Sequence, residues 1–275
     1  MRRAGGVAAV LVLLVSPAGA RPLRPRGESV RLEADRAVLE YEKGDLDASE
    51  AEAFLEMADR GVADIEALVA PGLPDWARRR GRIRFVVGSW VPISRTWGRT
   101  VGLPLDRVRT RSAPYLHETV HALVPARGDR VWLSEGLASY LESWVSENRG
   151  GYDAHVFTRA GDRGIHEAAR RTLATGPGRA VLPWVGARGE PPFMEEDRSG
   201  VARPFYVLSQ SLTKHVVDAA GLAAVVRSLV GGGEDGLQSD GLRSATGRSD
   251  EEWKREWLHA IGASALASAR SSPRP

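Results

Sequence analysis

The chain of 275 residues contains no cysteine. Without thiols there is no disulfide framework, no cysteine nucleophile, no thiolate-bound zinc and no lipid anchor on an N-terminal cysteine. A metal ion in this protein would therefore have to be held by histidine, aspartate or glutamate. The sequence contains six histidines, which keeps the number of possible ligand sets small.

Lysine is also scarce, because Lys43, Lys214 and Lys254 are the only ones and arginine supplies nearly all of the positive charge. The formal net charge at pH 7 is +3. Basic residues are scattered among acidic ones and do not gather in a stripe, which is typical of a solvated surface and not of a phosphate-binding one. We therefore expect no nucleic-acid partner.

Long apolar runs are missing except near the N-terminus. Arg2 and Arg3 precede an apolar run over residues 4–15, and small residues follow up to Ala20. This order is typical of a secretory signal with cleavage near Ala20. The run is too short for a membrane helix, which needs ~20 apolar residues. We expect an exported protein, periplasmic or extracellular, with no stable membrane span after cleavage.

The composition indicates an ordinary globular protein, with 43% hydrophobic and 27% charged residues. The length is sufficient for one sizeable domain with its own core. We predict a signal peptide over residues 1–20, a disordered lead-in over 21–28, one folded domain over 29–263 and a flexible tail over 264–275.

The first part of the predicted domain mixes strand and helix patterns. Alternating apolar and polar residues predict strands, and apolar residues at helical spacing predict a helix with Asp47 or Ser49 as its N-cap. The predicted elements are a hairpin of strands over residues 29–33 and 37–41, a helix over 46–69, a strand over 82–87, and a weaker strand with a loop over 98–108.

From residue 112 onward the predicted elements are all helices. Ser112 is the expected cap of a helix that has Pro114 in its first turn and ends near Val124. Further helices are predicted over residues 134–148, 154–174, 203–219, 222–229 and 250–263. The sequence thus predicts an α+β fold, with a small sheet-and-helix part over residues 29–124 followed by a mainly helical part over 125–263.

The predicted helix that ends near Val124 contains His117, Glu118 and His121 in the pattern His-Glu-x-x-His. Residues four apart lie on one face of a helix, so both imidazoles can reach a single ion. Glu118 lies about 100° round the helix, where its carboxylate can reach a water on the ion without binding the ion itself. A catalytic zinc typically has three protein ligands and one open position, so a third ligand is needed.

Glu135 is the predicted third ligand. A short loop over residues 125–129 lets the chain reverse, so that a carboxylate on the first turn of the next helix can face His117 and His121. Gly136 would let the two helices approach closely. A histidine pair buried for structural reasons would not predict this glutamate. We therefore predict one zinc ion per chain, held by His117, His121 and Glu135.

The residues from His117 to Tyr140 contain His-Glu-x-x-His followed by Trp-Leu-x-Glu-Gly-Leu-Ala. This segment resembles the gluzincin metallopeptidases, the clan of thermolysin and the zinc aminopeptidases. The chain is more closely similar to the small bacterial peptidase-MA-like proteins, whose Tyr-containing helix resembles the segment around Tyr206 and whose closing segment resembles residues 242–257. The resemblance implies a zincin-like fold and a zinc-dependent metallopeptidase acting on a peptide or protein.

The resemblance also implies roles for single residues. Glu118 would be the general base, and Tyr206 would stabilise the oxyanion unless it is only a packing residue. Tyr140 is expected to pack or to support the ligands from behind. The acid that follows the ligand glutamate by four residues in thermolysin-like enzymes is Ser139 here, so Ser139, a backbone carbonyl or Glu142 remain as partners of the histidines.

The exact hydrolytic activity stays open at this point. The Gly-Ala-Met-Glu-Asn-type motif of zinc aminopeptidases does not precede His117, which favours an endopeptidase, and the strand near residues 98–104 is a candidate to receive an extended peptide. The alternatives are a non-catalytic, zinc-stabilised peptide-binding or cell-envelope module, against which Glu118 argues, and a zinc hydrolase of a non-peptide amide. The histidines with no ligand spacing are His155, His166, His215 and His259.

Overall fold

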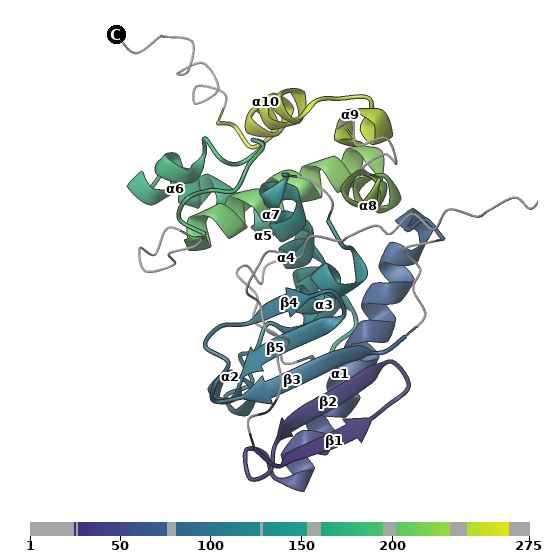
Figure 1. Ribbon diagram of the computed structural model, residues 1–275. Helices are drawn as coiled ribbons and strands as arrows, with labels where there is room; N and C mark the ends of the chain where they lie inside the picture. Colours follow the sequence, from purple (N-terminus) through teal and green to yellow (C-terminus); the bar gives the residue numbers. More distant parts are fainter. Residues whose placement is uncertain are drawn as a thin grey trace, which may run out of the picture.

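A mixed β-sheet forms one end of the molecule and a group of helices forms the other (Figure 1) in the computed structural model. The structure describes residues 25, 27–75, 81–126, 129–152, 161–194, 202–231 and 241–263. The expected signal peptide, most of the lead-in and the expected tail lie outside these residues. Within the described ranges, no helix has the length and apolar character required to cross a membrane.

The sheet has five strands in the order β1-β2-β3-β5-β4. Their bounds are Ser29–Glu33 for β1, Ala37–Glu42 for β2, Ile83–Gly88 for β3, Arg95–Trp97 for β4 and Thr100–Pro104 for β5. β1 and β2 form the predicted antiparallel hairpin, β3 runs parallel to β2 and to β5, and β4 is antiparallel to β5.

The edge of the sheet differs from the prediction. The expected strand over residues 98–108 is only five residues long, because the chain continues into the short helix α2 (Leu105–Arg109). β5 pairs with β3 on one side and with β4 on the other, so it has no free edge to receive a peptide. β4, which the sequence did not predict, takes the edge position.

Helix α1 (Ala48–Val69) connects β2 to β3 and covers one face of the sheet (Figure 1). Of the two predicted N-caps, Asp47 is the one that caps the helix. Its carboxylate accepts a hydrogen bond from the backbone N–H of Glu50 at 2.8 Å. The side chain of Glu50 in turn accepts from the N–H of Asp47 at 3.0 Å. This reciprocal capping fixes where the helix begins.

The two faces of the sheet carry different residues. On the inner face, Phe85 of β3 contacts Phe54 of α1, which also contacts Tyr115, with ring centroids 5.9 and 5.8 Å apart. On the outer face, the side chain of Glu40 accepts hydrogen bonds from Arg31 at 2.5 Å and from Arg84 at 2.9 Å. Alternation along the strands separates the apolar core side from an outer side that carries these charged pairs and a small separate apolar cluster of Val86, Val91, Trp90 and Trp97.

The helical part confirms the predicted α+β arrangement. After α3 (Tyr115–Leu123), which ends the sheet-and-helix part, its helices are α4 (Val131–Asn148), α5 (Gly161–Leu173), α6 (Gly176–Val181), α7 (Ala202–Ala220), α8 (Leu222–Val230), α9 (Gly241–Thr246) and α10 (Asp250–Ala260). The short helices α2, α6 and α9 were not predicted, because five or six residues are too few to show a helical period. α4 begins before the predicted residue 134, which places Glu135 in its second turn and not in its first.

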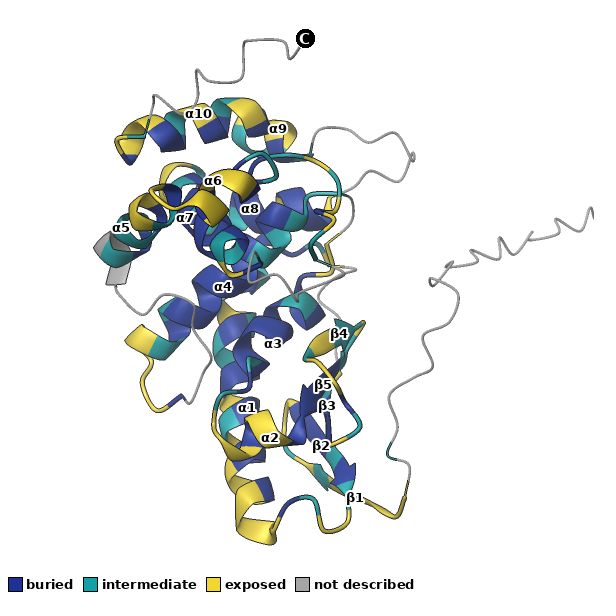
Figure 2. Cartoon of the chain, turned by 90° about the vertical axis from the view of Figure 1, so that its left-hand side faces the viewer, coloured by how far each residue is buried: buried dark blue, intermediate teal, exposed yellow. Residues whose placement is uncertain are grey.

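Helix α3 is the central element of the fold. The predicted cap is wrong, because the hydroxyl of Ser112 bonds that of Thr110 at 2.9 Å and no side chain caps the helix at Pro114. Burial fixes α3 instead: every residue of the helix except His121 is buried, as the dark blue of α3 in Figure 2 shows. α3 thus lies between the sheet with α1 on one side and α4 on the other.

Helices α4 and α7 approach each other closely at Gly136. A Cβ atom at this position would lie 2.5 Å from the backbone oxygen of Ser209 on α7. The sequence predicted that Gly136 serves the approach of α3 and α4, and this is wrong, because the glycine faces α7. The contact seats α7, which carries Tyr206, against the helix that carries Glu135.

Replacing Gly136 with alanine is therefore expected to destabilise the protein. Alanine is the better helix former by ~1 kcal/mol, but the clash with backbone atoms of α7 should outweigh this and leave a net loss of about 1–3 kcal/mol. Urea unfolding followed by circular dichroism measures the change. The matched control is Gly176→Ala at the start of α6, where an added Cβ meets nothing within 4 Å. Equal stability of the two variants would contradict the close packing.

Candidate metal centre

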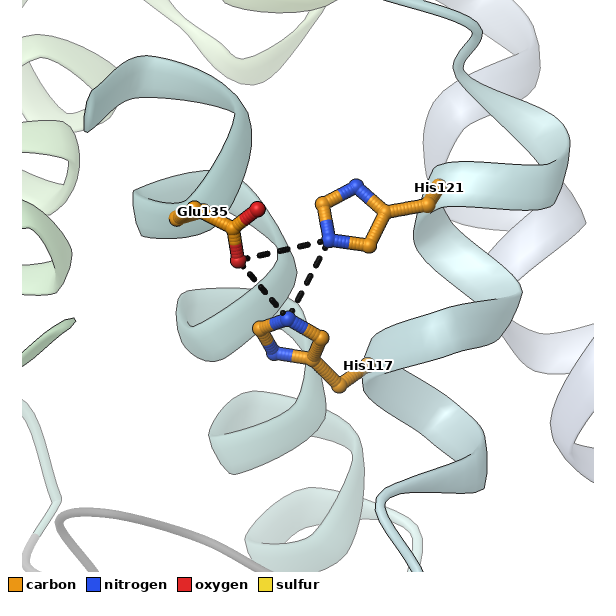
Figure 3. A group of neighbouring side chains, drawn as sticks. All are labelled: His117, His121 and Glu135. Atoms are coloured by element: carbon orange, nitrogen blue, oxygen red, sulfur yellow. Dashed lines mark hydrogen bonds and ion pairs between the residues drawn. The ribbon is translucent and has the colours of Figure 1, made fainter. Parts of the chain in front are cut away.

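Three metal-ligating side chains converge from α3 and α4 (Figure 3). The Nε2 atom of His117 lies 3.1 Å from the Oε2 atom of Glu135 and 3.1 Å from the Nε2 atom of His121. The Nε2 atom of His121 lies 3.4 Å from the same carboxylate oxygen. Within the described ranges, this is the one group of at least three such side chains whose ligand atoms are close enough to share an ion. The three residues that the sequence singled out are thus brought together.

The spacing fits a tetrahedral ion. Two ligand atoms that each lie ~2.0–2.1 Å from a tetrahedral zinc are about 3.3–3.4 Å apart by simple geometry. The three distances of 3.1, 3.1 and 3.4 Å are close to this value. Hydrogen bonding alone explains the arrangement poorly. The Nε2 atom of His117 faces both Glu135 and His121, and it carries at most one proton to donate. The donor set of two imidazoles and one carboxylate therefore suits zinc.

The charges of these groups are strongly coupled. Burial lowers the pKa of His121, but the negative charge of Glu135 and its hydrogen bond outweigh burial and raise that pKa to about 9. Burial likewise opposes the ionisation of Glu135, yet His121 and His117 overcome it and hold the pKa of this carboxyl far below its ordinary value. Without an ion, the carboxylate is therefore charged at neutral pH and His121 carries a proton.

The partners of the histidines differ from the three candidates that the sequence left open. The hydroxyl of Ser134 lies 3.3 Å from the Nδ1 atom of His121, so it orients this ring. The buried Nδ1 atom of His117 has no hydrogen-bond partner in the described part of the chain, so neither Ser139 nor Glu142 bonds it. Ser134 directly precedes the ligand Glu135, and this adjacency was the one signal that could have indicated its role.

Glu118 is held by the edge strand of the sheet. Its side chain is buried, and its Oε2 atom lies 2.7 Å from the hydroxyl of Thr96 on β4. The same hydroxyl lies 3.0 Å from the backbone oxygen of Glu118 and can donate to one acceptor at a time. Sequence reasoning missed Thr96, because a single threonine in a three-residue strand carries no motif.

A cavity of about 410 Å³ opens beside the three candidate ligands. Its walls include Glu118, Tyr206 of α7, and residues of β4 and of the loop that follows α3. The ring of Tyr206 lies 6.0 Å from that of His117, centroid to centroid. The structure therefore places both predicted catalytic residues, Glu118 and Tyr206, at the same cavity as the ligands. A volume of this size is typical of a small-molecule or peptide side-chain site.

The other histidines that the structure describes stand apart from this centre. His166 of α5 bonds the hydroxyl of Ser211 at 2.8 Å, and burial lowers its pKa. His215 packs against Trp253 with ring centroids 6.0 Å apart. His155 lies outside the described residues. Tyr140 is buried on α4, as expected of a packing residue.

Comparison with known proteins adds no relative: no protein-family model, curated protein or solved structure matches the chain. The chemistry of the centre is therefore inferred from its own geometry.

Zinc uptake is expected to release about one proton per chain at pH 7, because the pKa of His121 is about 9 and the ligand must lose its proton to bind. Below that pKa the proton competes with the metal, so the apparent affinity should rise about tenfold per pH unit as the pH increases toward 9. Calorimetry in buffers of different ionisation enthalpy counts the protons.

The exposed histidine of α10 provides the control for this titration. His259→Ala should still bind one zinc with the same proton release, whereas His121→Ala should lose tight binding. A zinc affinity that does not change between pH 6 and pH 8 would contradict the coupling of His121 to the ion.

Proposed function

We propose that the protein is a zinc-dependent metallopeptidase of the gluzincin type, with one zinc per chain held by His117, His121 and Glu135. The observation that carries this proposal is the position of Glu118: its buried carboxylate lines the same cavity onto which the three ligands open. Three protein ligands, an open side and an adjacent base are the parts of a hydrolytic zinc site.

The residues of the chain have distinct tasks in this mechanism. Zinc, when bound, supplies a Lewis acid that activates water and polarises the scissile carbonyl. Thr96 engages the Oε2 atom of Glu118, which leaves the Oε1 atom to take a proton from the attacking water. Glu118 then returns this proton to the amine as the bond between carbonyl carbon and nitrogen breaks, so one peptide bond and one water become a carboxylic acid and an amine.

Tyr206 is the proposed oxyanion stabiliser. Its ring stands at the cavity wall beside His117, on a helix other than those that hold the ligands. A phenol hydroxyl there can donate a hydrogen bond to the oxygen that gains negative charge as water adds to the carbonyl. Because Gly136 fixes the distance between α7 and α4, the position of Tyr206 relative to Glu135 is set by packing.

The two alternatives fit the site less well. A purely structural zinc is normally enclosed by four protein ligands, whereas this group of three adjoins a cavity of about 410 Å³. A non-peptide amide would need the same ligands and base, but the edge strand β4 lies along the cavity, and a strand edge suits an extended peptide. An endopeptidase acting outside the cytoplasm, after export and cleavage near Ala20, is therefore the form that we propose.

Glu118→Gln is expected to retain zinc and to lose about 10²–10⁴-fold in peptide hydrolysis, because the amide cannot accept the proton of water. Hydrolysis of a mixed peptide library, with zinc measured on the same samples, tests this. Glu147→Gln, on the exposed end of α4, is the matched control. Unchanged turnover in Glu118→Gln would remove Glu118 as the base, and a folded protein that binds no zinc would end the proposal.

Tyr206→Phe is expected to lower kcat by about 10²-fold with little change in KM, because the hydroxyl acts on a charge that develops only in the transition state. Steady-state kinetics on any peptide that the library identifies measures both constants. Tyr140→Phe, a buried tyrosine of α4, serves as the control for loss of a phenol hydroxyl. An equal effect of both variants on kcat would contradict a special role of Tyr206.

A further inference from the structure

The outer face of the sheet carries charges of alternating sign that are paired from strand to strand. Arg31 of β1 bonds Glu40 of β2, and Glu40 also bonds Arg84 of β3. Arg84 continues to β5, where its Nε atom lies 3.3 Å from the hydroxyl of Thr100. Each of these charged side chains has a neighbour on the next strand, as cross-strand pairing favours.

This series changes at the edge strand β4, where Arg95 and Trp97 flank Thr96. Side chains alternate along a strand, and Thr96 points inward to Glu118, so Arg95 and Trp97 lie on the outer face. The guanidinium carbon of Arg95 lies 4.3 Å from the centre of the Trp97 ring. Within the described ranges no carboxylate pairs with Arg95, and the residue opposite it on β5 is Gly102, which has no side chain.

Stacking on Trp97 gives Arg95 a defined place while leaving its donors available. A guanidinium stacked on an aromatic ring keeps its N–H groups in the ring-parallel plane, where they can bind a carboxylate in bidentate fashion. Arg95 is exposed, so a partner can reach it. In the described part of the molecule it is an exposed cation held by stacking, with no carboxylate within salt-bridge distance.

β4 also borders the cavity of the metal centre. Ser94, Arg95 and Thr96 belong to its wall, together with Glu118 and the ligands. β4 pairs with β5 on one side only, and in the described residues no strand pairs with its other side. An extended chain that added to this side would run past the three ligands, with alternate side chains directed to the inner and the outer face.

For a peptide that lies along β4, we propose that Arg95 selects an aspartate or glutamate at one position. The acidic side chain would lie on the outer face of the added strand, opposite Arg95, and continue the series of paired charges of the sheet. Its chain neighbours would point to the inner face, where Thr96 and Glu118 stand. This inference rests on the proposed function and gives its substrate class: peptides with an acidic residue near the scissile bond.

Charged residues also occur on edge strands simply to prevent pairing between molecules. Such a protective charge would leave the residue preference of the enzyme unaffected. A substrate-selecting Arg95 and a merely protective Arg95 therefore differ in whether the enzyme prefers acidic residues.

The test uses zinc-loaded full-length protein and a synthetic peptide library in which acidic, basic and neutral residues are equally frequent. Wild-type protein should cleave peptides with Asp or Glu enriched at one position relative to the cut. Arg95→Glu should lower kcat/KM for these peptides roughly two- to tenfold and shift the preference at that position to Lys or Arg. Arg107→Glu, the same charge change on the exposed side of α2, should keep the acidic preference.

A second measurement separates this inference from the peptidase proposal. Zinc-loaded Glu118→Gln protein is used to capture peptides from the same library, and its double variant with Arg95→Glu is compared with it. Cleavage without an acidic preference, or a preference that Arg95→Glu leaves unchanged, overturns the role of Arg95 and leaves the peptidase standing. If no peptide is cleaved but acidic peptides are captured, and this capture is lost with Arg95→Glu, the peptidase proposal alone is overturned. Neither cleavage nor selective capture overturns both.

Discussion

The burial of helix α3 is the constraint on which the rest of the structure depends. His117, Glu118 and Thr119 are polar, yet all three are buried on this helix. Burying polar groups is costly unless each finds a partner, and the surrounding elements supply most of these partners. Thr119 bonds within the helix to the backbone oxygen of Tyr115 at 2.7 Å, while Glu118 and His117 are met by β4 and α4. β4 and α4 are therefore positioned where they supply hydrogen-bond partners to the buried polar side chains of α3.

The interface of α4 and α7 also contains a buried polar side chain that is hydrogen-bonded to the neighbouring helix. Gln210 of α7 donates to the backbone oxygen of Ser139 on α4 at 3.2 Å, and the two helices touch at Gly136. Directional hydrogen bonds together with close backbone contact fix the relative position of two helices more narrowly than apolar packing alone. Such precision is relevant because Glu135 and Tyr206 reach the same cavity from these two helices.

The sequence could predict that His117, His121 and Glu135 come together, because their relationship is local. A spacing of four places His117 and His121 on one helical face, and a short reversal brings Glu135 opposite them. Thr96 and Ser134 could not be foreseen as partners, because each acts through a contact that only the folded chain creates. The same reason explains the error at Gly136: the sequence shows that a helix has a gap in its surface, but not which neighbour fills it.

Periodic elements were likewise predictable, whereas the sheet edge was not. The hairpin, α1 and the long helices follow from alternation or helical spacing over many residues. β4 has only three residues, and its strand conformation depends on pairing with β5. Short elements without a period of their own take their structure from tertiary contacts, and here such an element adjoins the cavity of the candidate metal centre.

The three ligands are also close in the sequence, since His117 and Glu135 are only 18 positions apart. A chain segment this short closes into a loop at small entropic expense even before the sheet has assembled. If the proposed zinc is bound, the same residues would also hold it transiently in the unfolded polypeptide, and metal bound to the unfolded state reduces the stabilisation that the folded state gains. The proposed zinc would thus contribute less to equilibrium stability than its affinity for the folded protein suggests.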